Sequence, residues 1–387
     1  MAKRGYRILD CDMHVIEPHD LWLEYLDPAF RERAPQIGQA PNTGAYGWRC
    51  EGRMFPAWSD DPRRGALNRK RYDQGDERFR RYDDAMARRF DAKSQLDAMD
   101  VEGIDVAVTF RTMASHVIAI DEMDPELSAA LCRAFNRWLT DRSREDPARI
   151  LSSALVPPQD PGLAVAEAER AMKEWGHRAI VLPSNPVLGR PWYDPAYDVV
   201  WAAACDLGVP VCFHGIQGAY QEHLGNRFLD NLMLMHAAAH PVEMMLSLGA
   251  LITGGVFDRF PRLRVGFLEC SCGWVPWWLW RLDEEHEKLG HADRQQLALR
   301  PSEYFQKHCF VAVEPDETGL DTVVEALGDD SWVISTDWPH DDSGYPHAMD
   351  TFLALPGLSD ASRRKILWDN CARLYGVEAP TSGPTVG

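Results

Sequence analysis

The chain has 387 residues, of which 45% are hydrophobic and 26% charged, and its formal net charge is −18. This composition is typical of a folded globular protein, and the negative charge argues against nucleic acid or an anionic membrane as the main partner. We expect no leader peptide, because no charged-then-apolar stretch opens the chain, and no apolar run reaches the roughly 18 residues of a membrane span. Nine cysteines without a CxxC spacing indicate reduced thiols. We therefore expect a cytoplasmic protein.

Short apolar segments alternate with helical segments along most of the chain. The predicted strands lie at 7–15, 104–110, 150–156, 179–182, 209–214, 263–269, 308–313 and 332–337. The predicted helices lie at 92–99, 124–145, 161–175, 195–206, 228–258, 274–290, 318–327 and 359–375. Such alternation favours a parallel sheet, and eight repeats favour an α/β fold closed as a (β/α)8 TIM barrel. A doubly wound open sheet is the alternative, but no glycine-rich phosphate loop follows the first strand.

The segment 27–90 breaks this rhythm after the first strand. Proline, glycine and charged residues interrupt any periodicity, although 46–54 resembles a small hairpin. Loops of this length in compact domains are usually functional lids or disordered. We expect a single barrel domain over 1–377, in which the insertion 27–90 forms a lid or cap. The last residues, 378–387, are rich in proline, glycine, threonine and serine and are expected to be a flexible tail.

Ligand-type residues stand where several predicted strands end. Asp12 and His14 share one face of the first strand, since residues two apart point the same way, and His214, Glu269 and Asp337 end later strands. Catalytic groups of such barrels lie at the carboxyl ends of the strands. Each residue taken singly has a structural explanation, such as a buried imidazole or a loop cap. Together they are residue types that bind divalent metals.

Three motifs resemble the amidohydrolase superfamily: Asp12-Met13-His14, Phe213-His214-Gly215 and 335–339 (STDWP). More narrowly, they are similar to its amidohydrolase-related branch, which includes aminocarboxymuconate-semialdehyde decarboxylase and γ-resorcylate decarboxylase. The segments 254–265 and 368–376 are similar to recurrent segments of that branch. The resemblance covers roughly 7–26 and 91–377 and leaves the insertion unexplained.

The resemblance implies one divalent metal ion, with zinc expected first and manganese or iron as alternatives. Its ligand positions fall on Asp12, His14, His214 and Asp337. Glu269 stands where decarboxylases of the branch carry a histidine. It could be a fifth ligand, a bridge to a second metal, or the general base. A carboxylate near a metal stays ionised, which suits ligation or base work better than acid work.

Other polar residues near the predicted strand ends are candidates for contact with substrate. His240 lies where the predicted helix 228–258 is interrupted, just before Pro241, and a catalytic role is weighed equally against a structural one. Arg111 ends the second strand and could pair with a substrate carboxylate, or form a salt bridge at the rim. His340 and Trp338 follow Asp337 closely and could hold a ligand or the substrate.

These residues predict a metal-dependent enzyme with two competing chemistries. In hydrolysis, the expectation we place first, a metal-activated water attacks an acyl or lactone carbon of a small, cyclic or aromatic, carboxylate-bearing substrate, and Asp337 or Glu269 takes the proton. The alternative is non-oxidative decarboxylation of a hydroxylated aromatic acid. A second alternative is a metal-free binding protein on the same barrel. The resemblance implies a homodimer, since members of the branch are often dimers, and the tryptophan-rich helix around 274–281 offers apolar surface that could be buried in a partner.

Overall fold

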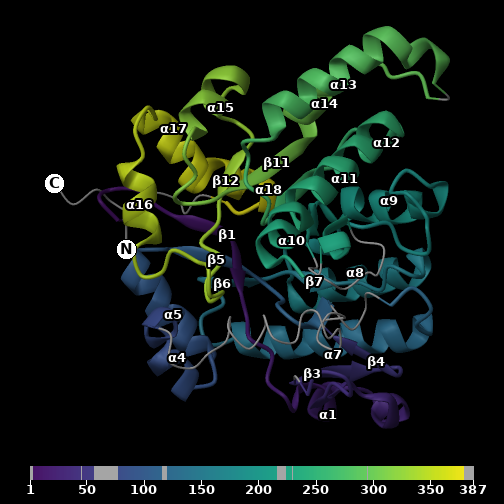
Figure 1. Cartoon of the computed structure of the whole chain (residues 1–387), viewed down its shortest axis with the longest axis vertical. Coiled ribbons are helices and arrows are strands. Elements are labelled where there is room, and N and C mark those ends of the chain that lie inside the picture. Colours follow the sequence, from purple (N-terminus) through teal and green to yellow (C-terminus); the bar gives the residue numbers. More distant parts are fainter. Residues whose placement is uncertain are drawn as a thin grey trace.

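The computed structural model describes residues 3–44, 46–55, 77–115, 120–215, 224–228, 230–293 and 295–378. The strands of a central ring lie in the interior with helices around them (Figure 1). The strands of the central ring are β1 (Leu9–His14), β5 (Val106–Phe110), β6 (Ile150–Ser152), β7 (Ala154–Leu155), β8 (Ile180–Pro183), β9 (Val211–His214), β10 (Val265–Leu268), β11 (Cys309–Val313) and β12 (Trp332–Ile334). Each predicted strand therefore contains an observed one.

Hydrogen-bonded ladders join these strands in two parallel sheets, β1–β5–β6 and β7–β8–β9–β10–β11–β12. β6 and β7 are two halves of one predicted strand, interrupted at Ser153, whose N–H and hydroxyl both donate to a carbonyl of β5. At the other junction, the Asp337 N–H donates to the Asp12 carbonyl (3.3 Å) and the His14 N–H to the Trp338 carbonyl (2.7 Å). The fold is therefore TIM-barrel-like, as predicted, although within the described residues the ladders form no single continuous sheet.

Most strands of the ring are buried along their whole length because helices cover them. Every residue of β1, β8, β9, β10, β11 and β12 is buried, as expected of parallel strands that are covered by helices. The polar residues of β1 are buried as well, among them Asp10, Asp12 and His14. Buried polar groups are costly unless they find partners or ligands, so this strand requires an explanation beyond packing.

Helices follow the strands at nearly all predicted places. They are α5 (Ala92–Glu102), α7 (Pro125–Ser143), α8 (Pro161–Trp175), η3 (Pro195–Tyr197), α9 (Asp198–Leu207), η4 (Leu224–Phe228), α10 (Leu232–Ala239), α11 (Pro241–Thr253), α12 (Val256–Arg259), α13 (Val275–Leu289), η5 (Gly290–Ala292), α14 (Pro301–His308), α15 (Leu320–Leu327), α16 (Ala348–Ala354), α17 (Asp360–Arg364), η6 (Lys365–Asp369) and α18 (Asn370–Tyr375). The bounds of α8 match the prediction because Asp160 caps its first turn and Gly176 ends it at φ +75°. The short helices α14 and α16 were not predicted.

The insertion after β1 has secondary structure of its own. It follows α1 (Leu21–Tyr25) and contains η1 (Pro28–Arg33), β2 (Gln36–Gln39), β3 (Tyr46–Cys50), β4 (Arg53–Phe55), α3 (Glu77–Arg80) and α4 (Asp83–Ala87). The predicted hairpin is confirmed as the antiparallel pair β3–β4, and β2 adds a third strand. Figure 1 shows α1, β3 and β4 together near α7. Residues 56–76, and 379–387 of the predicted tail, lie outside the described residues.

Several sequence-based expectations concern the surface and the environment of the protein. No helix in the described part of the chain combines the length and apolar character needed to cross a bilayer. All nine cysteines are unpaired, as expected of reduced thiols. Trp277 and Trp280 of α13 are 55% and 54% exposed. The apolar surface behind the homodimer prediction is therefore present, while the dimer itself stays a prediction.

Candidate metal centre

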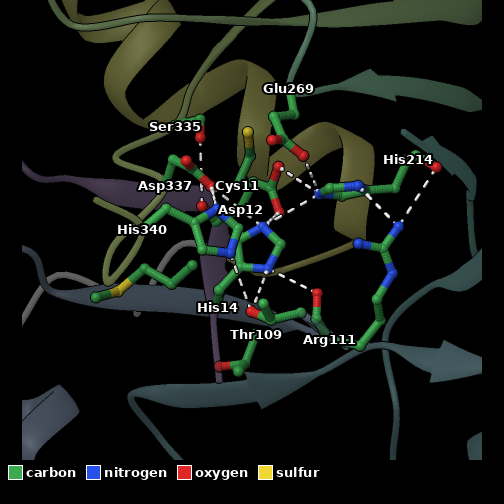
Figure 2. A network of polar contacts seen from close by, with 12 residues as sticks. Cys11, Asp12, His14, Thr109, Arg111, His214, Glu269, Ser335, Asp337 and His340 are labelled. Atoms are coloured by element: carbon green, nitrogen blue, oxygen red, sulfur yellow. Dashed lines mark hydrogen bonds and ion pairs between the residues drawn. The ribbon is translucent and has the colours of Figure 1, made fainter. Parts of the chain in front are cut away.

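Strands β1 and β9 place three ligand-type side chains next to one another. Asp12 and His14 alternate on β1 and share a face of it, and His214 is the last residue of β9. All three side chains are fully buried, and Figure 2 shows them pointing toward one another. The His14 Nε2 atom lies 3.4 Å from one Asp12 carboxylate oxygen and 3.1 Å from His214 Nε2. The other Asp12 oxygen lies 3.3 Å from His214 Nε2.

The hydrogen bonds around His14 leave a lone pair on its Nε2 atom, which faces Asp12 and His214. His14 Nδ1 lies 2.7 Å from the Arg111 carbonyl oxygen, which can only accept, so Nδ1 carries the proton and Nε2 of a neutral ring carries a lone pair. Both Asp12 carboxylate oxygens are buried without a hydrogen-bond partner in the described structure. The ligand atoms of Asp12, His14 and His214 lie within 4.8 Å of one another. This donor set fits a divalent cation.

The protonation states of the same residues also suit a metal. Burial alone would raise the pKa of Asp12, but the imidazoles of His214 and His14 outweigh it and hold this pKa well below its usual range. Burial, together with the charge of His340, lowers the pKa of His14 to about 4. Asp12 is therefore a carboxylate and His14 a neutral imidazole at pH 7, the forms in which both residues bind metals.

Asp337 and His340 form a second group that shares His14. The Asp337 carboxylate lies 3.2 Å from His14 Nε2 and 2.8 Å from His340 Nδ1. Asp337 has a φ of +54°, a left-handed conformation that costs a non-glycine residue on the order of 1–3 kcal/mol and is concentrated at functional sites. Burial alone would lower the pKa of His340, but the Asp337 carboxylate raises this pKa to about 10. The pair therefore holds a proton at neutral pH.

Glu269 and His240, two further residues predicted for the site, lie beside His214 in the same centre. One Glu269 carboxylate oxygen lies 3.3 Å from His214 Nε2, and the other lies 3.7 Å from His240 Nε2. Burial alone would raise the pKa of Glu269, but the neighbouring imidazoles, His240 first, lower it to about 2. Burial lowers the pKa of His240 to about 4. Glu269 is thus a carboxylate beside a neutral imidazole, as a ligand or base requires, and the choice between these roles stays a prediction.

Arg111 and Trp338, two of the residues predicted to contact substrate, make contacts that support the ligands. Arg111 is buried, and its Nη2 atom lies 2.9 Å from His214 Nδ1 and donates to the Gly215 carbonyl at 2.8 Å. The Trp338 ring is buried against Phe90, with 6.0 Å between ring centroids. Their contact with substrate, and that of His340, stays a prediction.

Two further carboxyl groups near the centre were not predicted, the buried Glu17 and the partly exposed Glu314. Glu17 accepts hydrogen bonds of 2.8–3.0 Å from the backbone N–H groups of residues 112–114, which fixes the loop after β5. Glu314 follows β11, and burial together with the charges of Asp337 and Glu269 raises its pKa well above the usual range. The strand-end rule could have found Glu314, because it follows the seventh predicted strand as Glu269 ends the sixth. No sequence signal marks Glu17, since its partners are backbone groups.

Comparison with known proteins places these residues in a family. The family model described as amidohydrolase matches residues 9–377. A γ-resorcylate decarboxylase of Polaromonas sp. strain JS666 is 26% identical over 295 residues, covering 72% of this chain and 85% of the relative. Among solved structures, 5-carboxyvanillate decarboxylase LigW from Sphingomonas paucimobilis has a TM-score of 0.72 at 22% identity and covers 97% of this chain and 100% of its own.

A dihydroxybenzoic acid decarboxylase from Polaromonas sp. JS666, crystallised with manganese and the inhibitor 2-nitroresorcinol, has the same fold. Its TM-score is 0.68 at 18% identity, with 96% of this chain and 97% of that chain covered. At these identities the structural matches support the fold alone. The family match spans the whole barrel and confirms the resemblance first seen in the strand-end motifs. This protein belongs to the amidohydrolase superfamily and is one of its metal-dependent hydrolases or carboxy-lyases.

Proposed function

We propose that the protein is a non-oxidative decarboxylase of a hydroxylated aromatic acid. The observation that carries this proposal is a buried ligand set, Asp12, His14 and His214, that adjoins a proton-holding pair, Asp337 and His340. Decarboxylation needs both parts, because the carboxylate must be held while the ring carbon receives a proton. The γ-resorcylate decarboxylases among the relatives support the same choice. Hydrolysis, our first expectation, has no such support among the named relatives.

The metal of this centre is proposed to be a single divalent ion, manganese in preference to the zinc expected first. Asp12, His14 and His214 would hold it, and Asp337 and Glu269 are the further carboxylates within reach of these histidines. A ligand set rich in carboxylates suits manganese, and the dihydroxybenzoic acid decarboxylase from Polaromonas was crystallised with this ion. Such an ion supplies Lewis acidity toward the carboxylate and the adjacent hydroxyl oxygen of a substrate.

The proton step falls to the pair of His340 and Asp337. In decarboxylation the bond between ring carbon and carboxylate breaks, its electron pair stays on the ring carbon, and that carbon gains a proton as carbon dioxide leaves. His340 carries a proton at Nδ1 toward Asp337, and its Nε2 atom lies 3.0 Å from the Thr112 hydroxyl, which fixes the ring. Glu269, whose pKa is lowered to about 2, stays a carboxylate and is unsuited to donate this proton.

The insertion 27–90 is proposed to cover the centre, since its last part contacts the loop that carries His340. Arg81 donates to the Asp341 carbonyl at 2.7 Å, and the Tyr82 hydroxyl donates to the His340 carbonyl at 2.9 Å. We further propose that the protein is cytoplasmic and forms a homodimer.

A substrate panel tests the reaction class directly. The purified enzyme, stripped of metal and reloaded with Mn²⁺, is incubated with 2,6-dihydroxybenzoate, 5-carboxyvanillate, unsubstituted benzoate and a set of aryl lactones. We expect carbon dioxide and the matching phenol from at least one hydroxylated acid, and neither from benzoate. In D₂O the phenol should carry one deuterium at the vacated ring carbon. Ring opening of a lactone without carbon dioxide release from any acid would overturn the proposal in favour of hydrolysis.

A further inference from the structure

Asp10 is a buried carboxylate that contacts both chain segments bearing the metal ligands. It lies on β1, two residues before Asp12, and is fully buried. One of its carboxylate oxygens accepts the Asp12 N–H at 3.0 Å and the Thr336 N–H at 3.3 Å. The other oxygen accepts the Thr336 hydroxyl. A single side chain thus binds the backbone of one ligand-bearing segment and the residue directly before Asp337 in the other.

These bonds lie where the ladders of the barrel are interrupted. β1 pairs with β5 and β12 pairs with β11, but the ladders do not connect β1 with β12. The Asp12 carbonyl accepts the Asp337 N–H and the Ser335 hydroxyl there, both at 3.3 Å. Across the same seam the Asp10 carboxylate adds two further bonds, from the Thr336 N–H and the Thr336 hydroxyl, while its bond from the Asp12 N–H lies within β1.

We propose that Asp10 is a positioning residue of the metal centre, which fixes the Asp12 and Asp337 carboxylates relative to each other through Thr336. Asp10 contacts neither substrate nor metal in this proposal and acts through the segments that it joins. The proposal rests on the proposed function in that it requires the Asp12 centre to bind a divalent ion. Groups that orient metal ligands typically contribute 10- to 100-fold to metal affinity, because a misdirected ligand cannot meet the ion.

The test compares four variants by Mn²⁺ titration of the full-length protein, with calorimetry for affinity and electron paramagnetic resonance for the coordination environment. Asp10→Ala removes all three bonds, and we expect Mn²⁺ affinity to fall about 10- to 100-fold. Asp10→Asn offers an amide oxygen that can accept from the two N–H donors, so its Mn²⁺ affinity should be higher than that of Asp10→Ala. Thr336→Val removes only the hydroxyl bond, and an intermediate loss is expected. Thr140→Val is the matched control, since this buried hydroxyl donates to the Asn136 carbonyl outside the centre.

Thermal unfolding of the metal-free variants separates positioning from stability. If Asp10→Ala does not fold, Thr336→Val carries the test, because valine has nearly the shape of threonine. A lowered unfolding temperature with unchanged Mn²⁺ affinity in the folded Asp10→Asn and Thr336→Val proteins would overturn the proposal. A wild-type protein that binds Mn²⁺ tightly but releases no carbon dioxide overturns the proposed function. The Mn²⁺ affinities of the variants then still decide whether Asp10 positions the metal ligands. A wild-type protein that binds no divalent ion overturns both.

Discussion

Two groups of side chains share His14, and they differ in the elements that carry them, in burial and in pKa. Asp12, His14 and His214 sit on strands, and their side chains are fully buried. Asp337 and His340 sit on the loop after β12, where their side chains are 10% and 18% exposed. Burial lowers the pKa of His14 to about 4, whereas the Asp337 carboxylate raises the pKa of His340 to about 10.

The difference assigns separate tasks to the two groups. We infer that the strand group binds the metal, because its side chains are fully buried on strands and Asp12 and His14 are in the protonation states that bind metals. The loop group holds a proton and is closer to solvent, which is what a proton donor that must be recharged requires. Strand ends therefore supply the fixed half of this centre, and the loop supplies the half whose charge can change. Mutations in the two groups should accordingly separate metal binding from turnover.

The largest effect is expected from His214→Ala in the strand group. Removal of its Nε2 atom, 3.1 Å from His14 Nε2, should lower Mn²⁺ affinity by more than about 100-fold, since even residues that only orient ligands contribute 10- to 100-fold. Calorimetric titration and elemental analysis of the dialysed protein measure the loss. Full retention of Mn²⁺ would place the metal elsewhere.

In contrast to His214→Ala, His340→Gln should reduce turnover and leave metal binding nearly unchanged. We expect kcat to fall about 100-fold, within the usual range for loss of a general acid, while Mn²⁺ affinity changes by only a few fold. Steady-state kinetics of carbon dioxide release, combined with Mn²⁺ titration, measure both. His177→Gln is the control, because His177 is also buried but is bonded to Thr140 and a backbone carbonyl instead of a carboxylate. Loss of metal in His340→Gln would make His340 a ligand.

Replacement of Glu269 tests whether this residue acts with the strand group as a metal ligand or in turnover as a base. Its carboxylate lies 3.3 Å from His214 Nε2 and stays ionised, so Glu269→Gln should weaken Mn²⁺ binding about 10-fold if it is a ligand. If it is a base, turnover falls while the metal stays bound. Glu167→Gln is the control, a buried glutamate that bonds to Asn136 away from the centre. No change in either quantity would make Glu269 structural.

The pH dependence of stability should also separate buried histidines with and without a carboxylate partner. The folded-state pKa of His340 is raised from 6.5 to about 10, so its contribution is complete below pH 6.5 and is lost as the pH rises through 10. Burial lowers the pKa of His177 to about 4, so its contribution is lost as the pH falls from 6.5 through 4. Urea unfolding of metal-free wild type and His340→Gln should show a stability gap that narrows from pH 6.5 upward. A gap that widens there contradicts the assignment.

Strand ends could be predicted from the sequence because short apolar segments fix where each strand stops. That rule located His214 and Asp337 at the rim, and the period of two on β1 paired Asp12 with His14. The supporting contacts could not be predicted in the same way. Asp10 bonds to Thr336 across 326 positions of the chain, and nothing local in the sequence specifies that register. Likewise, α14 and α16 span only 8 and 7 residues, too short for a clear helical period.

The smallest effect is expected from Tyr82→Phe in the insertion. The Tyr82 hydroxyl donates to the His340 carbonyl at 2.9 Å and lies 2.7 Å from the Ser343 hydroxyl, and its ring stacks on Tyr345. Phenylalanine keeps the stacking and removes the hydrogen bonds, which are worth about 1 kcal/mol each. We therefore expect kcat to fall a few fold while Mn²⁺ affinity stays unchanged.

Tyr25→Phe is the matched control for this variant, because the Tyr25 hydroxyl donates to Asp141 away from the His340 loop. Kinetics and Mn²⁺ titration of both variants give the comparison. A loss of kcat confined to Tyr82→Phe means that the insertion helps to hold the loop group in place. Equal kinetics in the two variants would mean that His340 is positioned by Thr112 and Asp337 alone. A loss of metal would show instead that the loop and strand groups are coupled, and the division of tasks between them would fail.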